Sequence, residues 1–201
     1  MTRERVLEYG PGAALIETSR DTIAMAQALL DTGRFREVVP AERSVLVMLR
    51  PGTAVADIEG IVEGLPPELP LVEGRDIEIP TIYDGPDLAF VADATGCSVD
   101  EVIALHAGVV YHAAFAGFAP GYVYCTGLDP RLRLPRRATP RTRVPAGSVA
   151  IADLYTAVYP QASPGGWHLL GTTHLELFDI TRSEPSLIRP GDRVHFTVRT
   201  A

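Results

Sequence analysis

Hydrophobic and polar positions divide the chain into a regularly patterned N-terminal third and a turn-rich remainder. Apolar residues recur with helical spacing over residues 21–30 and 53–65. Short apolar or alternating runs predict strands at residues 5–9, 13–17, 37–39, 44–49 and 75–79. After the first strand, the order β-α-β-β-α-β fits a ferredoxin-like α/β domain, which we place over residues 1–83.

A second domain is expected over residues 84–201, beginning with two short helices. The first covers residues 87–94. The second follows Ser98 and ends near Ala107, because Ser98 and Glu101 match a capping box in which each side chain satisfies the other residue's backbone amide.

From Phe115 to Trp167, Gly and Pro recur every few residues, so most of this stretch cannot be helical. Short apolar runs such as residues 149–151 lie between the turns, and strand-like runs follow at residues 175–178 and 193–198. This pattern predicts a small, tightly turned β-barrel or sandwich and an α+β fold overall. A loop-rich β domain without an active site is the plainer alternative for the same stretch.

Composition narrows the classes of function. The chain has 201 residues, of which 46% are hydrophobic, and a formal net charge of -7. An acidic chain is a poor general binder of nucleic acid or anionic membrane, and no apolar run approaches the ~20 residues of a membrane span. We therefore expect neither nucleic acid nor membrane as a partner.

Two further features bear on the compartment. The first residues lead straight into a strand-like run without a signal-peptide pattern. Cys97 and Cys125 have no metal-binding spacing and form no disulfide framework, and two thiols suit a reducing environment. We expect a cytoplasmic protein.

All 18 basic side chains are arginine, and the chain contains no lysine. This excludes a biotinyl- or lipoyl-lysine carrier, a Schiff-base lysine and a P-loop lysine. If the chain meets ATP or carboxybiotin, it must use arginine, backbone amides or a partner chain.

Arginines gather in one segment that has no acidic residue, at positions 131, 133, 136, 137, 141 and 143. Arginine presents a rigid fork of donors suited to carboxylate or phosphate. Arg141 and Arg143 alternate with Thr142 just before a turn, so both can point to one side, and we predict that they bind a small anionic group. The alternatives are a solvated loop with arginine stems on apolar surface, contact with an acidic partner, or contact with nucleic acid, which the acidic overall charge disfavours.

The segment Ser163-Pro-Gly-Gly-Trp167 predicts a turn whose backbone amides at Gly165 and Gly166 are uncovered. Such amides can hold an oxyanion, and we expect the turn to shape a substrate site. A tight hairpin explains the pattern equally well.

Three side chains are candidates for acid–base chemistry. Asp153 and Tyr155 follow a strand-like run, and His112 lies in an alternating segment where it faces either the barrel interior or solvent. His168 and His174 are six positions apart without Cys or carboxylate at ligand spacing, so no metal site is expected.

Several motifs occur in order between Ile79 and Val198. They are Phe115-Ala-Gly-Phe-Ala-Pro-Gly-Tyr122, Leu128-Asp-Pro-Arg131, Pro135-Arg-Arg-Ala-Thr-Pro-Arg141, Val144-Pro-Ala-Gly-Ser-Val-Ala-Ile151, Tyr159-Pro160, Ser163-Pro-Gly-Gly-Trp167 and Pro190-Gly-Asp-Arg-Val194. Together they resemble the family of 5-oxoprolinase B subunits, also called allophanate hydrolase subunit 1, which includes a Kip-type inhibitor of a sporulation kinase.

The resemblance implies a ferredoxin-like domain followed by a cyclophilin-like β-barrel, and a second cyclophilin-like subunit as partner. With a third subunit, such complexes open 5-oxoproline to glutamate using ATP. Related domains belong to urea carboxylase, which uses biotin held elsewhere, so no covalent biotin is expected on this chain. We expect Phe118, Pro120 and Tyr159, which lie in the motifs, to join Arg141 and the Ser163 turn around a small anionic or cyclic-amide substrate.

Departures from the family pattern cluster in segments expected to touch substrate. The family's Gly-Gly-x-Gln-Thr-Gly run is here Ala152-Asp-Leu-Tyr-Thr-Ala157, so Tyr155 replaces the usual Gln. Its Tyr-Leu-Gly-Gly is here Tyr124-Cys-Thr-Gly127, and its Gly-Arg-Thr is here Gly171-Thr-Thr173. A retained scaffold with an altered lining indicates either a changed reaction or lost catalysis.

Three hypotheses follow. The first is a subunit of an ATP-dependent 5-oxoprolinase-type hydrolase within a hetero-oligomer, and it is the leading one. The second is a diverged stand-alone enzyme that acts on a different small molecule. The third is a non-enzymatic regulator that binds a kinase or another protein.

Overall fold

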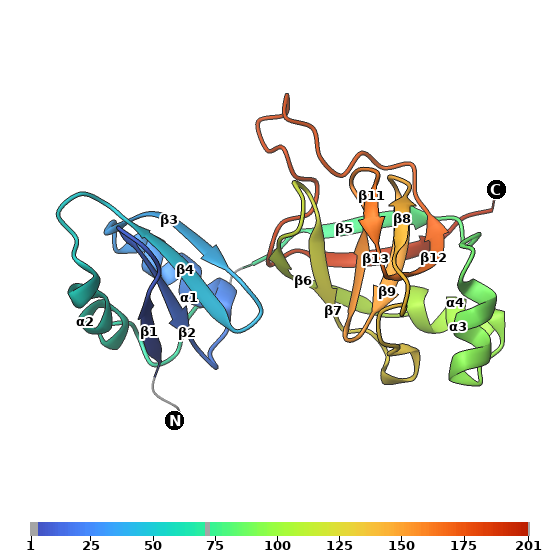
Figure 1. The fold of residues 1–201 in the computed structure, drawn as a ribbon, viewed down its shortest axis with the longest axis horizontal. Coiled ribbons are helices and arrows are strands. Elements are labelled where there is room, and N and C mark those ends of the chain that lie inside the picture. The colour runs from blue at the N-terminus through green and yellow to red at the C-terminus, as the bar shows by residue number, and fades with distance from the viewer. Residues whose placement is uncertain (1–3, 71–72, 201) are drawn as a thin grey trace. The chain divides into compact units, whose positions relative to one another are not determined.

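The computed structural model describes residues 4–70 and 73–200, which fall into two compact units, Met1–Glu73 and Gly74–Ala201 (Figure 1). Each unit has its own hydrophobic core. Within the described residues, no helix is long and apolar enough to cross a membrane.

The first unit is an antiparallel four-stranded sheet, in the order β1-β2-β4-β3, with helices beside it (Figure 1). Its core is built from residues such as Ile16, Met25, Leu29 and Phe35, which are almost completely buried. The elements are β1 (Arg5–Glu8), β2 (Ala13–Glu17), α1 (Thr22–Asp31), β3 (Phe35–Pro40), β4 (Ser44–Leu49), η1 (Val55–Asp57) and α2 (Ile58–Glu63).

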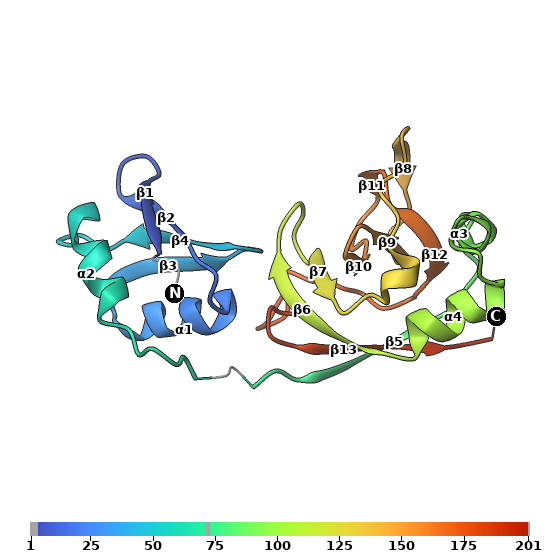
Figure 2. The same ribbon diagram turned by 90° about the horizontal axis from the view of Figure 1, so that it is seen from below.

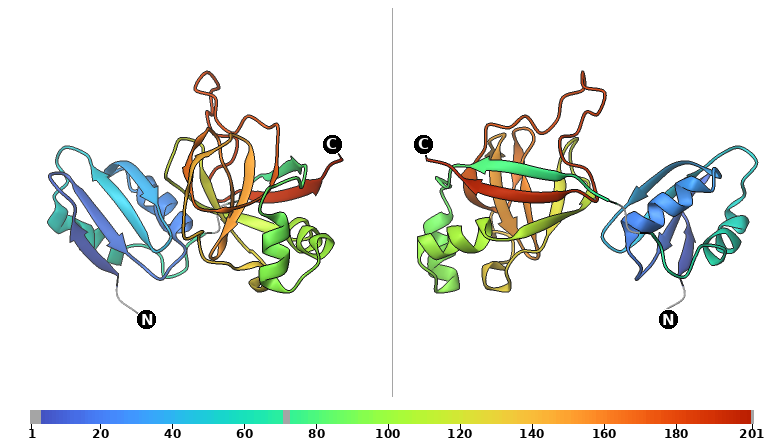
Figure 3. Two further views of the ribbon diagram at one scale, coloured as in Figure 1. Left: turned by 45° about the vertical axis from the view of Figure 1, so that its right-hand side comes forward. Right: turned by 180° about the vertical axis from the view of Figure 1, so that it is seen from behind.

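One strand expected in the first unit belongs to the second. The run predicted at residues 75–79 is β5 (Asp76–Thr81), and it pairs in parallel with β13 (Arg193–Val198) (Figure 3). In a β-α-β-β-α-β domain the last strand would pair with the strand that corresponds to β2. In this sheet β1 occupies that edge position instead. The chain accordingly divides into its two units between Glu73 and Gly74, and not between the predicted residues 83 and 84.

The second unit is a seven-stranded sheet in the order β12-β9-β10-β7-β6-β13-β5. Its two edges approach each other at one isolated pairing, Ile82 with Thr172, which makes the sheet a nearly closed barrel. The remaining strands are β6 (Val110–Ala116), β7 (Val123–Thr126), β9 (Ser148–Ala152), β10 (Tyr155–Val158) and β12 (His168–Thr172). The predicted fold class, an α/β domain followed by a β-barrel, is confirmed.

Smaller elements complete the barrel. A separate two-stranded sheet, β8 (Arg141–Val144) with β11 (Ser163–Gly165), lies on the side of the barrel away from β5 and β13 (Figure 2). The helix α3 (Leu88–Thr95) contacts β12, and α4 (Val99–Ala107) contacts β13. The predicted capping box of α4 is present, since Ser98 and Glu101 exchange hydrogen bonds. A short turn of helix, η2 (Pro130–Leu132), precedes β8.

The predicted strand at residues 175–178 is wrong. Phe178 makes only an isolated pairing with Ser186, and the connection between β12 and β13 is otherwise irregular. Its alternation arises because Leu177 is buried and Leu175 packs against the barrel core, not because the segment joins a sheet.

Candidate functional site

Five aromatic side chains pack together on one side of the barrel. We call Tyr122, Tyr124, Tyr155, Tyr159 and Trp167 the aromatic cluster. Tyr122 lies at its centre, with ring centroids 5.1 Å from Tyr124, 5.2 Å from Tyr159 and 5.9 Å from Trp167. The rings meet edge to face, an arrangement that the ring quadrupoles favour. Burial raises the pKa of Tyr122 and of Tyr159, so both phenols stay uncharged.

Tyr159, a predicted substrate-binding residue, is a core residue. Its side chain is only 2% exposed. A Cβ atom at Gly165 would lie 2.3 Å from the Tyr159 hydroxyl oxygen, so this glycine is needed for close approach of the backbone to the ring. The backbone at Gly165 therefore helps to cover the Tyr159 ring. Tyr159 can contact a ligand only if the backbone around Gly165 moves.

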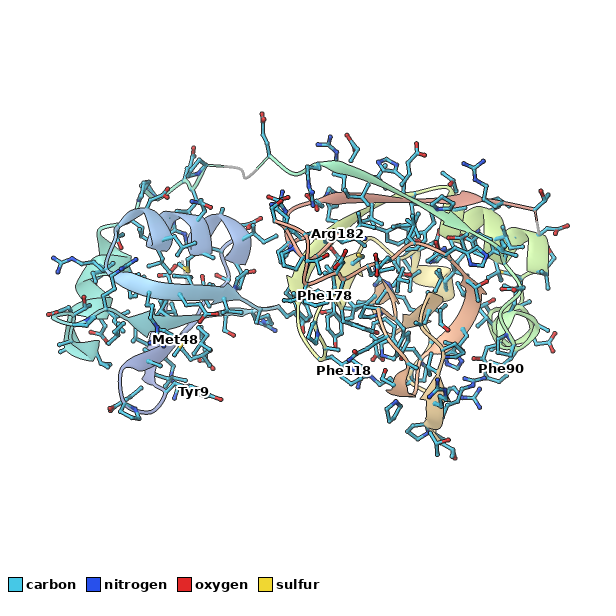
Figure 4. All side chains as sticks on the ribbon, turned by 90° about the horizontal axis from the view of Figure 1, so that it is seen from above. Tyr9, Met48, Phe90, Phe118, Phe178 and Arg182 are labelled. Carbon is cyan, nitrogen blue, oxygen red and sulfur yellow. The ribbon has the colours of Figure 1, made fainter. Side chains whose placement is uncertain are left out.

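Phe118 and Pro120 lie on an exposed loop beside the cluster. The Phe118 side chain is 64% exposed and its backbone has φ 71, a left-handed conformation that is unusual for an aromatic residue. Its ring contacts Tyr122 edge to face at 5.2 Å. Figure 4 shows Phe118 at the surface of the second unit. The loop places the exposed Phe118 ring next to the buried rings of the aromatic cluster. The role of Phe118 and Pro120 in substrate binding stays a prediction.

A buried carboxylate lies beside Leu169 in β12. Asp87 is 3% exposed and precedes α3. Its Oδ1 accepts hydrogen bonds from Arg137 Nη1 at 2.8 Å and Arg141 Nη2 at 2.7 Å, and its Oδ2 accepts one from the Leu169 amide at 2.8 Å. Burial alone raises the pKa of Asp87, but these donors and the two positive charges outweigh it and hold the pKa below its usual range.

His168 completes this group, which we call the Asp87 centre (Asp87, Arg137, Arg141 and His168). The imidazole is 4% exposed, its Nε2 lies 2.9 Å from the Pro135 carbonyl oxygen, and its ring stacks on Phe90 with centroids 5.2 Å apart. Because a carbonyl oxygen can only accept, Nε2 carries a proton, and in the tautomer with a single ring proton Nδ1 is an acceptor.

Backbone pairing holds the centre together. Gly165 of β11 pairs with Arg141 of β8, and the Arg137 amide donates to the Gly166 carbonyl at 2.7 Å. The Asp87 amide donates to the Leu169 carbonyl at 3.1 Å. The predicted turn at Ser163, Gly165 and Gly166 is thus a short strand and its continuation.

The predicted pair Arg141 and Arg143 is not brought together. Arg141 turns inward to Asp87, whereas Arg143 on the same strand is exposed. Arg137, four positions earlier, is the second arginine at the carboxylate. Alternation along β8 could not reveal this, because the charge that draws Arg141 inward lies 54 positions away in the sequence.

Two of the acid–base candidates, Asp153 and Tyr155, lie at the β9–β10 hairpin, and the third, His112, lies on β6. Asp153 is exposed at the tip of the β9–β10 hairpin, has φ 51, and faces Arg136 with a separation of 4.0 Å. Tyr155 is half-buried against Phe115 and Tyr124. His112 is exposed on the outer side of β6, so it does not line the barrel interior. An acid–base role for Asp153, Tyr155 or His112 stays a prediction.

His106, near the end of α4, has a structural role, but a lone histidine at a helix end gives no signal in the sequence that it is buried. It is fully buried, with Nδ1 2.7 Å from the Tyr83 hydroxyl and Nε2 2.8 Å from Thr156 Oγ1. Thr156 donates its own proton to the Ala150 carbonyl, so Nε2 carries the imidazole proton and Nδ1 accepts from Tyr83. Burial lowers the pKa of His106 to about 3. This neutral histidine ties α4 to the barrel wall.

Within residues 4–70 and 73–200, no group of three or more His, Cys, Asp or Glu side chains could hold a metal ion. Both cysteines are free thiols, and burial raises the pKa of Cys125 to about 12, so it is not a reactive thiolate.

Comparison with known proteins gives the family. Residues 2–188 match the family described as carboxyltransferase domain, subdomain C and D. The B subunit of 5-oxoprolinase from Escherichia coli O157:H7 is 45% identical over 202 residues, covering 95% of this chain and 90% of that protein. The corresponding subunit of Haemophilus influenzae is 38% identical, covering 94% of this chain and 91% of that protein. The chain belongs to the carboxyltransferase subdomain C and D family, among the B subunits of 5-oxoprolinase.

Solved structures agree with this assignment. The crystal structure of TTHA0988 superposes with a TM-score of 0.81 at 39% identity, covering all of this chain and 41% of that one. The chain thus spans about two fifths of TTHA0988. The conserved uncharacterized protein PH0987 from Pyrococcus horikoshii has a TM-score of 0.60 at 34% identity, covering 97% of each chain. The urea amidolyase of Kluyveromyces lactis shares the fold, with a TM-score of 0.75 at 18% identity.

Proposed function

We propose that this chain is the B subunit of an ATP-dependent 5-oxoprolinase, which opens a cyclic amide together with a second cyclophilin-like subunit and a third subunit. The observation that carries this proposal is the 45% identity to a 5-oxoprolinase B subunit over nearly the full length of both chains. Retention of the framework turns around the aromatic cluster supports the same substrate class.

The division of labour follows from the side chains available. A chain without lysine cannot form a P-loop, so we assign the nucleotide phosphates to the complex as a whole. This subunit contributes the exposed loop at Phe118 and the Ser163–His168 segment to the substrate site. We place the cyclic-amide substrate against this face, where the partner subunit covers it and excludes water.

The test is reconstitution. The 201-residue chain is co-expressed with the two proposed partner subunits from the same host, and glutamate formed from 5-oxoproline is measured with and without ATP. We expect ATP-dependent glutamate formation by the complex and none by this chain alone. A complex that assembles and hydrolyses ATP but leaves 5-oxoproline intact would overturn the proposed substrate.

One observation favours a second candidate, a diverged enzyme that acts on another small molecule. Asp153 has φ 51 at a position where the resembling family usually carries glycine, and Tyr155 replaces the usual glutamine. If divergence at these positions changed the substrate, Tyr155→Gln in the complex should raise 5-oxoproline turnover. Unchanged turnover, from a variant that still assembles, would remove this candidate.

A further inference from the structure

We propose that the Asp87 centre binds the carboxylate of a small monoanionic ligand, with Phe90 as the apolar neighbour of the ligand's body. This proposal does not depend on the ring-opening reaction, because it rests on the charges and donors of the second unit alone.

The first argument is the balance of charge. Two guanidinium groups, Arg137 and Arg141, meet a single carboxylate, Asp87, and both donate to the same oxygen. Their side chains are 32% and 23% exposed, and that of Asp87 is 5% exposed. The two arginines and Asp87 together carry one surplus positive charge in a partly desolvated place. Such a charge is costly unless an anion pairs with it.

The second argument is the set of unused hydrogen-bonding atoms. Arg137 Nε, Arg141 Nη1 and His168 Nδ1 are buried, and none of them has a hydrogen-bond partner among the described residues. Buried polar atoms are nearly always paired with protein, ordered water or a ligand, so three such atoms on neighbouring residues support a ligand site. His168 is itself more than nine-tenths buried and held by Phe90 and the Pro135 carbonyl, which fixes the direction of its free nitrogen.

The charged end of the ligand follows from the two arginines. A planar carboxylate matches the donor geometry of guanidinium, and its single charge balances the single surplus charge. A phosphate dianion would instead give the occupied centre a net negative charge. The third free atom, His168 Nδ1, is an acceptor, so it suits an N–H or O–H group carried by the same ligand.

The body of the ligand follows from Phe90. This ring is 53% exposed and stacks on His168 with an interplanar angle of 15°. Figure 4 shows Phe90 at the surface of the unit. A carboxylate with a ring or other apolar body can therefore extend along Phe90 while its charged end meets the arginines.

The experiment is calorimetric titration of the 201-residue chain with matched probes. We use benzoate and L-5-oxoproline as ring carboxylates, acetate as a carboxylate without a ring, 2-pyrrolidinone as an uncharged ring, and inorganic phosphate. We expect at least one ring carboxylate to bind with a dissociation constant of about 1 mM or tighter, and 2-pyrrolidinone and phosphate to bind at least tenfold more weakly. Binding of benzoate without 5-oxoproline would support the site and place the ring-opening substrate elsewhere.

Variants assign the binding to this centre. Arg137→Gln removes the surplus charge and should weaken carboxylate binding about ten- to a hundredfold. Arg137→Lys keeps the positive charge but not the planar donor geometry of the guanidinium, and should weaken carboxylate binding less than Arg137→Gln does. Arg131→Gln changes the net charge equally at an exposed position paired with Asp129, and should leave affinity unchanged. Phe90→Ala, at an exposed position, should lower the affinity for benzoate but not the affinity for acetate.

Two results would overturn the proposal. One is the absence of carboxylate binding to the folded chain at concentrations up to about 10 mM. The other is carboxylate binding that Arg137→Gln and Arg137→Lys leave intact while thermal unfolding shows both variants to be folded. If Arg137→Gln fails to fold, Arg137→Lys and Phe90→Ala still decide the question.

Discussion

Asp192 and Asp87, two aspartates of the second unit with the same 3% exposure, are paired with arginine in different ways. Asp192 has one arginine: Arg75 donates from Nε to Oδ1 at 3.2 Å and from Nη2 to Oδ2 at 2.6 Å. The amides of Arg75 and Arg189 donate to the same carboxylate. Asp87 has two arginines on one oxygen, and part of each guanidinium is unused.

The difference teaches that burial alone does not distinguish a structural ion pair from a binding site. At Asp192 the charges cancel and the donors are matched, so the pair closes the turn before β13. At Asp87 a positive charge and several hydrogen-bonding atoms are left over. This difference in the number of charges and donors is the reason for proposing Asp87, and not Asp192, as a ligand site.

The largest expected effect separates the two arginines. Arg75→Gln leaves a buried carboxylate without its cation and should lower the free energy of unfolding by about 3 kcal/mol. Arg137→Gln leaves Asp87 paired with Arg141 and should cost less than about 1 kcal/mol. Urea unfolding followed by the fluorescence of Trp167, the only tryptophan, reports on the second unit. Equal losses in the two variants would remove the distinction.

A second prediction concerns His106, a buried group that is neutral and fully paired. Its pKa of about 3 lies below the ordinary value, so between about pH 6.5 and 3 the unfolded chain binds a proton that the folded chain does not. Stability contributed by the neutral form is complete above about pH 6.5 and falls by about 1.4 kcal/mol per pH unit as the pH decreases.

The measurement is the slope of unfolding free energy against pH between about 6.5 and 4.5. His106→Gln should reduce this slope by about 1.4 kcal/mol per pH unit, whatever its stability at neutral pH. His112→Gln, at an exposed position, is the matched control and should keep the slope of the unmodified chain. A His106→Gln slope equal to that of the control would show that the histidine is not buried in solution.

The smallest expected effect involves Asp153, an exposed aspartate that contrasts with both buried ones. Its φ of 51 favours glycine, so Asp153→Gly should stabilise the second unit by about 0.5 kcal/mol. Asp153→Ala keeps the unfavourable backbone geometry and should give no gain. If Asp153→Gly instead destabilises by more than about 1 kcal/mol, the carboxylate and its approach to Arg136 contribute more than the backbone costs.

Local features of the fold were predictable from the sequence. The strands at residues 13–17 and 44–49 match β2 and β4, and the capping box of α4 is where Ser98 and Glu101 place it. These depend on periodicity and on contacts a few residues apart. The sheet to which β5 belongs was predicted wrongly, because its partner Arg193 lies 117 positions from Asp76.

The site was predicted less well than the fold for the same reason. Asp87 and Arg137 are 50 positions apart, as are His106 and Thr156, and no local pattern joins them. The sequence could mark the arginine-rich segment as a candidate anion site. It could not show which arginine a buried carboxylate would draw inward, nor that Tyr159 would be sealed beneath Gly165.

The parallel pairing of β5 with β13 has a consequence for protein synthesis. β5 leaves the ribosome first among the barrel strands, and its neighbour β13 follows 117 positions later, roughly 10 s at about 10 residues per second. Throughout that interval the β5 backbone lacks the partner that it has in the finished barrel. All four strands of the first unit's sheet have by then been translated. The barrel therefore closes after translation of β13, and the nascent chain presents an open strand edge to chaperones before it can meet another subunit.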